Sequence, residues 1–253
     1  THPEYLEQAR TFLMLPDYFH FLLTGEKRSE YTNATSTQLV NAETKDWDDE
    51  IISRLGYPRE MFLPLSQPGT LVGTFTKEIE DEVGFSCQVV LPATHDTASA
   101  VMAVPCQEDH CLYISSGTWS LMGTENKKAI CTEESRQKNF TNEGGYDFRY
   151  RYLKNIMGLW MIQSVRHEEK DQYSFAQLCE MADECSDFPS RVLVNAPEFL
   201  APESMTEAVR RYCEKTGQRV PETTGELAAV IYQSLAKCYG ETVGEIEQLT
   251  GEH

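Results

Sequence analysis

Long apolar segments are missing from this chain of 253 residues. No run reaches the roughly 18 consecutive apolar residues that a helix needs to cross a bilayer. The first five residues, THPEY, also lack the basic and apolar regions of a secretory signal peptide. We therefore expect a cytoplasmic protein with no membrane partner.

Basic residues are scarce as well. The 22 Lys and Arg residues stand against 40 Asp and Glu residues, which leaves a formal net charge of −18 at pH 7. The basic residues gather only into dipeptides such as Lys127-Lys128 and Arg210-Arg211. A surface of this charge repels a phosphate backbone, so the composition argues against nucleic acid as a partner.

Several common catalytic and metal-binding patterns are absent. The sequence contains no Walker A pattern, no GxGxxG, no GxSxG and no HExxH. Its eight cysteines include no CxxC pair, and the six scattered histidines complete no zinc pattern. We expect reduced cysteines packed mostly in the interior.

The residues that are present indicate a folded α/β protein. Hydrophobic residues make up 40% of the chain and aromatic residues 10%, as in ordinary globular proteins. Apolar periodicity and the positions of Gly and Pro predict helices over 4–15, 16–25, 47–55, 77–83 and 97–104. They predict strands over 71–75, 87–91, 111–115, 119–124 and 148–153, of which 87–91 is expected to be buried.

The second half is predicted to end in helices. Asn155 is placed to cap a helix that runs to about Glu168. Three further helices have capping-box starts, Ser174 with Gln177, Ser204 with Glu207 and Thr223 with Glu226, and the last extends to about Leu249. The composition turns polar at residues 107–110, and we place a boundary there between domains 1–105 and 106–253.

His95, Asp96 and Thr97 follow a predicted buried strand directly and precede a predicted helix. Ligands bind at such strand ends in α/β folds, because the strand end and the helix N-terminus leave a crevice. The alternative is structural: Asp96 or Thr97 caps the helix, and His95 is a packed histidine.

A second polar turn, residues 115–118 (SSGT), joins two predicted strands. Its backbone amides and hydroxyl groups suit a phosphate, whereas an ordinary β-turn is the structural alternative. Asn155 and Gln163 lie eight residues apart, which places them on related faces of the predicted helix. The structural alternative is that Asn155 only caps the helix and that Gln163 is exposed to solvent. Trp119 and Trp160 are expected in the core.

Four ordered segments resemble the FGGY carbohydrate kinases, and among them the branch that phosphorylates L-rhamnulose. They are 95–101 (HDTASAV), 115–123 (SSGTWSLMG), 141–145 (TNEGG) and 154–160 (KNIMGLW). Residues 16–19 (PDYF) and 30–35 (EYTNAT) extend the resemblance towards the N-terminus. The resemblance implies an actin-like (ribonuclease H-like) fold of two domains, with sugar and Mg-ATP bound between them.

The resemblance also implies roles for individual residues. Asp96 is the general base that takes a proton from the sugar, and His95, Asp96, Thr97 and Asn155 bind the sugar. Thr118 and Gln163 match positions that contact ATP. Mg²⁺ ligands stay unassigned, because Asp96 alone is a poor site for a hard octahedral cation.

Two segments of the family pattern have no match in this sequence: the N-terminal phosphate-binding hairpin and the glycine-rich segment after the long helix. We therefore expect the central part of such a kinase, incomplete at both ends and inactive alone. Another ketose such as L-fuculose, or a non-catalytic sugar-binding module, stays open as an alternative. The sequence does not specify the oligomeric state.

Overall fold

The computed structural model describes residues 3–106 and 111–252, and the chain divides into two compact units. The first unit comprises residues 1–111, 124–132 and 141–152, and the second comprises residues 112–123, 133–140 and 153–253. The predicted boundary at 107–110 lies outside the described residues and stays a prediction. In the described ranges, no helix has the length and apolar character needed to span a membrane.

The first unit begins with α1 (Pro3–Gln8) and α2 (Leu15–Thr24). Pro16 lies in the first turn of α2, and Gly25 ends the helix with a left-handed φ of 73°. The helix predicted over 4–15 is too long, because the chain leaves α1 after Gln8. Phe12 instead donates a backbone hydrogen bond to Met61 and packs into a core cluster, so tertiary contacts replaced the last helical turns.

Short elements surround that cluster. They are β1 (Ser29–Glu30), α3 (Tyr31–Ala34), η1 (Thr35–Thr37), α4 (Asp49–Arg54), η2 (Arg59–Met61) and β2 (Leu65–Ser66), which pairs in parallel with β1. Helix α4 begins two residues after the predicted start at residue 47, and Asp48 caps it by accepting a hydrogen bond from the Ile51 amide. The core cluster consists of Ala34, Trp47, Ile52, Met61 and Phe62.

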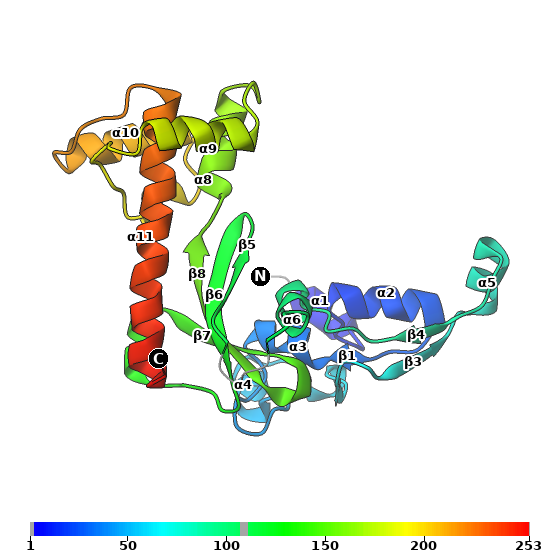
Figure 1. Cartoon of the computed structure of the whole chain (residues 1–253). Helices are drawn as coiled ribbons and strands as arrows, with labels where there is room; N and C mark the ends of the chain where they lie inside the picture. The colour runs from blue at the N-terminus through cyan, green and yellow to red at the C-terminus, as the bar shows by residue number, and fades with distance from the viewer. Residues whose placement is uncertain (1–2, 107–110, 253) are drawn as a thin grey trace. The chain divides into compact units, whose positions relative to one another are not determined.

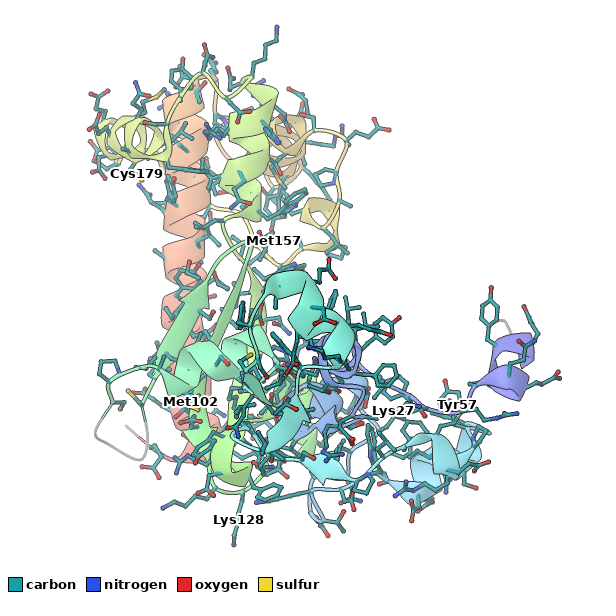
Figure 2. The ribbon with its side chains drawn as sticks, turned by 90° about the vertical axis from the view of Figure 1, so that its right-hand side faces the viewer. Lys27, Tyr57, Met102, Lys128, Met157 and Cys179 are labelled. Atoms are coloured by element: carbon teal, nitrogen blue, oxygen red, sulfur yellow. The ribbon has the colours of Figure 1, made fainter. Side chains whose placement is uncertain are left out.

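A two-stranded antiparallel ladder completes the first unit, formed by β3 (Leu71–Thr74) and β4 (Gln88–Val90). Between them lies α5 (Lys77–Val83), with the predicted bounds and the predicted Gly84 end. The expectation of a fully buried strand over 87–91 is wrong: only one face of β4 is covered, and Val90 is 49% exposed. Helix α6 (Asp96–Met102) follows, and Figure 2 labels Met102 at its end.

A four-stranded sheet has the order β5-β6-β8-β7. Its strands are β5 (Tyr113–Ser116), β6 (Trp119–Asn126), β7 (Phe140–Gly144) and β8 (Tyr150–Met157), with α7 (Glu133–Gln137) and η3 (Tyr146–Phe148) in the connections. Tyr113 pairs with Gly123 and Ser116 with Ser120, which confirms the predicted hairpin of β5 and β6.

The helix predicted to start at Asn155 is wrong. Asn155 lies within β8, which continues to Met157 (Figure 2), and α8 (Trp160–Glu168) begins only after Gly158. The segment pairs as a strand of the sheet and is buried on both sides of Asn155: Tyr152 and Leu153 precede it, and Ile156 and Met157 follow it. Asn155 and Gln163 therefore do not share a helix.

The helical part of the second unit consists of α8, α9 (Phe175–Glu184), η4 (Pro197–Phe199), α10 (Met205–Lys215) and α11 (Thr224–Thr250). The first turns of α11 are packed among α8, α9 and α10 (Figure 1), and α11 makes its most extensive contacts with α9. The capping boxes predicted at Ser174 and Thr223 are confirmed, as is the long α11 with its Gly251 end.

Two burial expectations are wrong. Among the eight free cysteines only Cys213 is buried, and Cys87, Cys106, Cys131 and Cys179 are exposed. Trp119 is 42% exposed, because it opens β6 at the hairpin turn instead of facing the core.

The start of α10 differs from the predicted capping box. The Ser204 side chain accepts a hydrogen bond from the Glu207 amide, but the carboxylate that returns to the helix start belongs to Glu168 of α8. Glu168 accepts from the amides of Met205 and Thr206 at 2.5 and 3.1 Å and from the Ser204 hydroxyl at 2.9 Å. Burial raises the pKa of Glu168, but these hydrogen bonds outweigh it and lower the pKa overall.

We predict that Glu168→Gln lowers the free energy of unfolding by about 1 kcal/mol near neutral pH, the usual value of a helix cap. The lowered pKa means that Glu168 contributes stability above its unfolded pKa and loses it as the pH falls. The difference between the two proteins should therefore shrink in acid, as measured by urea unfolding. Glu207→Gln is the control, because the Glu207 carboxylate forms only an exposed pair with Arg210 and should matter little.

Candidate functional site

The fully buried carboxylate of Glu30 organises the candidate site in the first unit. It caps α3 by accepting hydrogen bonds from the Thr32 amide at 2.8 Å and the Asn33 amide at 3.1 Å. The Thr32 hydroxyl donates to it at 2.6 Å. The amide and hydroxyl of Thr94 also donate to it, at 3.0 and 2.8 Å. One carboxylate thus joins β1, α3 and the turn before α6.

Further hydrogen bonds fix the same turn. The His95 amide donates to the Thr32 hydroxyl at 3.3 Å, and the Ser99 hydroxyl of α6 donates to the Ala93 carbonyl at 2.6 Å. Asp17 lies on the other side of Glu30 and accepts its backbone N–H. Burial, and then the nearby Glu30 charge, raises the pKa of Asp17 to about 6. The backbone that carries His95 is therefore held by several independent bonds.

Asp96 is the first residue of α6, and its side chain is 97% exposed. Its Oδ1 accepts from the Thr97 amide at 2.6 Å and from the Thr97 hydroxyl at 3.3 Å. His95, not Asp96 or Thr97, occupies the N-cap position, although the Asp96 carboxylate does accept from the first-turn amide of Thr97. In the described part of the chain no hydrogen bond reaches Oδ2 of Asp96, so this oxygen is accessible to a ligand.

The His95 imidazole lies between two carboxylates. Its Nδ1 is 3.4 Å from Oδ1 of Asp96, and its Nε2 is 3.5 Å from Oε2 of Glu143. Burial, and then the positive charge of Arg151, lowers the pKa of His95. The imidazole is therefore neutral near pH 7 and carries a single N–H donor.

Glu143 and Arg151 are site residues that the sequence did not single out. Glu143 reaches His95 because its neighbour Gly144 approaches α3 closely: a Cβ at Gly144 would lie 2.6 Å from the Tyr31 ring. The Gly144 amide also donates to the Thr35 hydroxyl at 2.9 Å. Glu143 lies in the TNEGG segment, which was noted in the sequence for its resemblance to the kinase family. Nothing in the spacing of that segment indicated that Glu143 contacts His95.

The second unit carries the other predicted site residues, Thr118, Asn155 and Gln163. Asn155 is exposed on β8, and Thr118 lies in the turn between β5 and β6. The structure thus brings His95, Asp96 and Thr97 together in one unit, and it places the other three residues in the unit described separately.

Gly158 lies between β8 and α8 and packs against the hairpin turn of β5 and β6. A Cβ on Gly158 would lie 2.7 Å from the Ser120 nitrogen and 2.8 Å from the Gly117 carbonyl oxygen, so only glycine fits. The amides of Leu159 and Trp160 donate to the carbonyls of Gly117 and Thr118 at 3.0 and 3.1 Å. The first amides of α8 are therefore satisfied by the hairpin turn, which places Thr118 beside the start of the helix.

Gln163, one turn into α8, lines a cavity of about 510 Å³. Its other lining residues are Trp160, Ser164, Arg166, His167, Glu168, Phe175, Pro202, Glu203 and Met205. Buried Trp160 Nε1 and Ser164 Oγ have no hydrogen-bond partner in the described structure. The Trp160 and Phe175 rings give this cavity an aromatic lining beside the Gln163 amide.

The described residues contain no group of three or more His, Cys, Asp or Glu side chains that could hold a metal ion.

We predict that Gly158→Ala lowers the free energy of unfolding by about 1 to 3 kcal/mol, because backbone atoms cannot move away from the new methyl group. Gly240→Ala is the matched control, since Gly240 lies in α11 with no atom near its Cβ position. Alanine should stabilise that helix by about 0.5 to 1 kcal/mol. Thermal unfolding of both variants tests this, and equal melting temperatures would contradict the close junction.

The sequence matches the FGGY family of carbohydrate kinases in two parts. The pattern of the N-terminal domain matches residues 1–103, and that of the C-terminal domain matches residues 112–253. Similar proteins include the rhamnulokinase of Halalkalibacterium halodurans, 53% identical over 98% of this chain and 53% of its own length. The rhamnulokinase of Bacillus subtilis is 41% identical over 98% of this chain and 51% of its own length.

Solved structures show the same fold at low sequence identity. A xylulose kinase from Rhodospirillum rubrum is 16% identical with a TM-score of 0.72, over 99% of this chain and 50% of that one. Plasmodium falciparum glycerol kinase with ADP is 13% identical with a TM-score of 0.70, over 99% of this chain and 50% of that one. The predicted actin-like α/β fold of sugar kinases is confirmed, and the chain spans about half the length of the curated relatives it matches.

Proposed function

The chain belongs to the FGGY family of carbohydrate kinases, and from this premise we propose that the protein transfers the γ-phosphoryl group of ATP to L-rhamnulose. The product is L-rhamnulose 1-phosphate, and the reaction belongs to L-rhamnose catabolism in the cytoplasm. Identities of 41 and 53% to proteins named rhamnulokinase support this choice of sugar. The proposed chemistry rests on one observation, the exposed Asp96 carboxylate at the start of α6.

Asp96 acts as the general base. Its Oδ1 is held by Thr97, while Oδ2 is accessible to the O1 hydroxyl group of the sugar. The sugar oxygen forms a bond to the γ-phosphorus, the bond from phosphorus to ADP breaks, and the hydroxyl proton moves to Asp96. A positioned base typically accelerates such a step by about 10²- to 10⁴-fold.

His95, Thr97 and Asn155 bind the sugar in this proposal. The exposed Asn155 amide offers both a donor and an acceptor, which suits the hydroxyl groups of a ketose, and the neutral imidazole of His95 lies beside Asp96. Thr97 contributes mainly through Asp96, because its amide and hydroxyl hold the carboxylate in place.

Thr118 and Gln163 bind ATP. The turn at Thr118 offers a hydroxyl group, and the cavity beside Gln163 is lined by the Trp160 and Phe175 rings, which suit a nucleobase. Mg²⁺ supplies charge neutralisation on the phosphates when ATP is bound. We assign it no protein ligand, in keeping with the described residues.

We predict that Asp96→Asn in the full-length protein lowers kcat for ketose-dependent ADP release by about 10²- to 10⁴-fold. Asn is nearly isosteric but cannot accept the proton, so the KM for the sugar should change little. The assay includes L-fuculose and other ketoses beside L-rhamnulose, because Asp96 would serve any of them. Retained activity in the Asn variant contradicts the role of Asp96, and a preference for another ketose contradicts the choice of sugar.

We predict that Gln163→Ala raises the KM for ATP several-fold and leaves the KM for the ketose unchanged, because the loss of one side-chain hydrogen bond costs about 1 kcal/mol. Gln172→Ala is the matched control, since Gln172 is exposed, bonds only to Glu169 and does not line the cavity. Equal KM values for ATP in the two variants would show that the nucleotide binds elsewhere. Sugar binding without any nucleotide binding, measured by calorimetry, would favour a non-catalytic sugar-binding module.

A further inference from the structure

Glu143 lies behind His95, away from the exposed carboxylate of Asp96. Its side chain is only 15% exposed, and its Oε2 is 3.5 Å from Nε2 of His95 and 3.0 Å from Nη2 of Arg151. The three side chains come from three different elements: His95 precedes α6, Glu143 lies in β7 and Arg151 in β8. The first unit therefore assembles the group through tertiary contacts.

The Arg151 guanidinium pairs with Glu143 and fixes the position of its carboxylate. Its side chain is completely buried, and its Nε and Nη2 groups donate to the Gly144 carbonyl at 3.4 and 3.3 Å. A buried cation is stable only beside an anion, and Glu143 is the carboxylate in contact with it. The pair therefore holds the Glu143 carboxylate at a fixed place against the imidazole.

We propose that Glu143, held by Arg151, is a positioning residue that orients His95 and selects the tautomer with its proton on Nε2. This inference rests on the proposed kinase function. The Nε2–H group then points to Glu143, and Nδ1 keeps a lone pair towards Asp96.

The selected tautomer favours proton transfer to Asp96. A lone pair on Nδ1 faces Oδ1 of Asp96 at 3.4 Å and offers no donor to the ionised carboxylate, which keeps Asp96 a good proton acceptor. In the other tautomer, Nδ1–H would donate to the ionised Asp96 and stabilise it. A carboxylate stabilised in its charged form is a weaker base.

The charged groups around His95 come from four elements. They are Asp96 of α6, Glu143 of β7, Arg151 of β8 and Glu30 of β1, and the three carboxylates raise the pKa of His95 while burial and Arg151 lower it. Removal of the Glu143 charge should therefore lower the pKa of His95 further.

The test compares Glu143→Gln with Glu125→Gln in the full-length protein. Glu125 also pairs with an arginine, Arg149, at 3.7 Å within the same unit, but it makes no ion pair with His95. The first readout is the His95 titration followed by NMR, and the second is ketose-dependent ADP release.

We expect Glu143→Gln to lower the His95 pKa and to reduce kcat on the order of tenfold, because Asp96 is a weaker base when Nδ1 of His95 carries the proton. The KM for ATP should stay constant, and Glu125→Gln should change neither readout. Glu143→Asp keeps the charge and should show smaller effects; it supplies the same comparison if the Gln variant does not fold.

An unchanged His95 titration in Glu143→Gln overturns the inference, whether or not the protein is a kinase. A lowered pKa with an unchanged kcat overturns it as well, because Glu143 would then be only a neighbour of His95. Failure of the kinase proposal is recognised separately, by the absence of ketose-dependent ADP release from the unsubstituted full-length protein.

Discussion

The Glu30 carboxylate is the interaction on which the first unit depends. A fully buried carboxylate needs several donors to remain stable without water, and Glu30 receives them from Thr32, Asn33 and Thr94. These donors belong to two chain segments that are about sixty residues apart in sequence. The turn that carries His95 and Asp96 is fixed relative to α3 for this reason, although α6 itself is short and has no side-chain cap.

At two glycines the backbone approaches a neighbouring segment closely, and both contacts help to fix the positions of candidate site residues. Gly144 lets β7 approach Tyr31 and Thr35, which brings Glu143 to His95. Gly158 lets the start of α8 approach the hairpin turn, whose carbonyls accept the first helix amides. In both cases the absence of a side chain allows polar backbone groups to meet, and a functional residue lies next to the contact.

Local signals predicted the elements whose ends depend on nearby residues. Helices α5 and α11 end at glycines, and Ser174 and Thr223 form capping boxes, all within a few residues of chain. Signals of the same kind gave wrong predictions where contacts between residues far apart in the sequence determine the local structure. Asn155 looked like a helix cap but pairs into the sheet, and Glu207 looked like the partner of Ser204, although Glu168 from another helix fills that role.

The sequence by itself determined the family, the α/β character and the turn at His95, Asp96 and Thr97, because these depend on ordered motifs and short-range patterns. It did not determine the surroundings of that turn. Only the tertiary structure placed Glu30, Glu143 and Arg151 around His95, since these residues come from separate strands whose side chains meet after folding. The exposure of Asp96 was likewise decided in three dimensions, because His95 took the capping position and left the carboxylate at the surface.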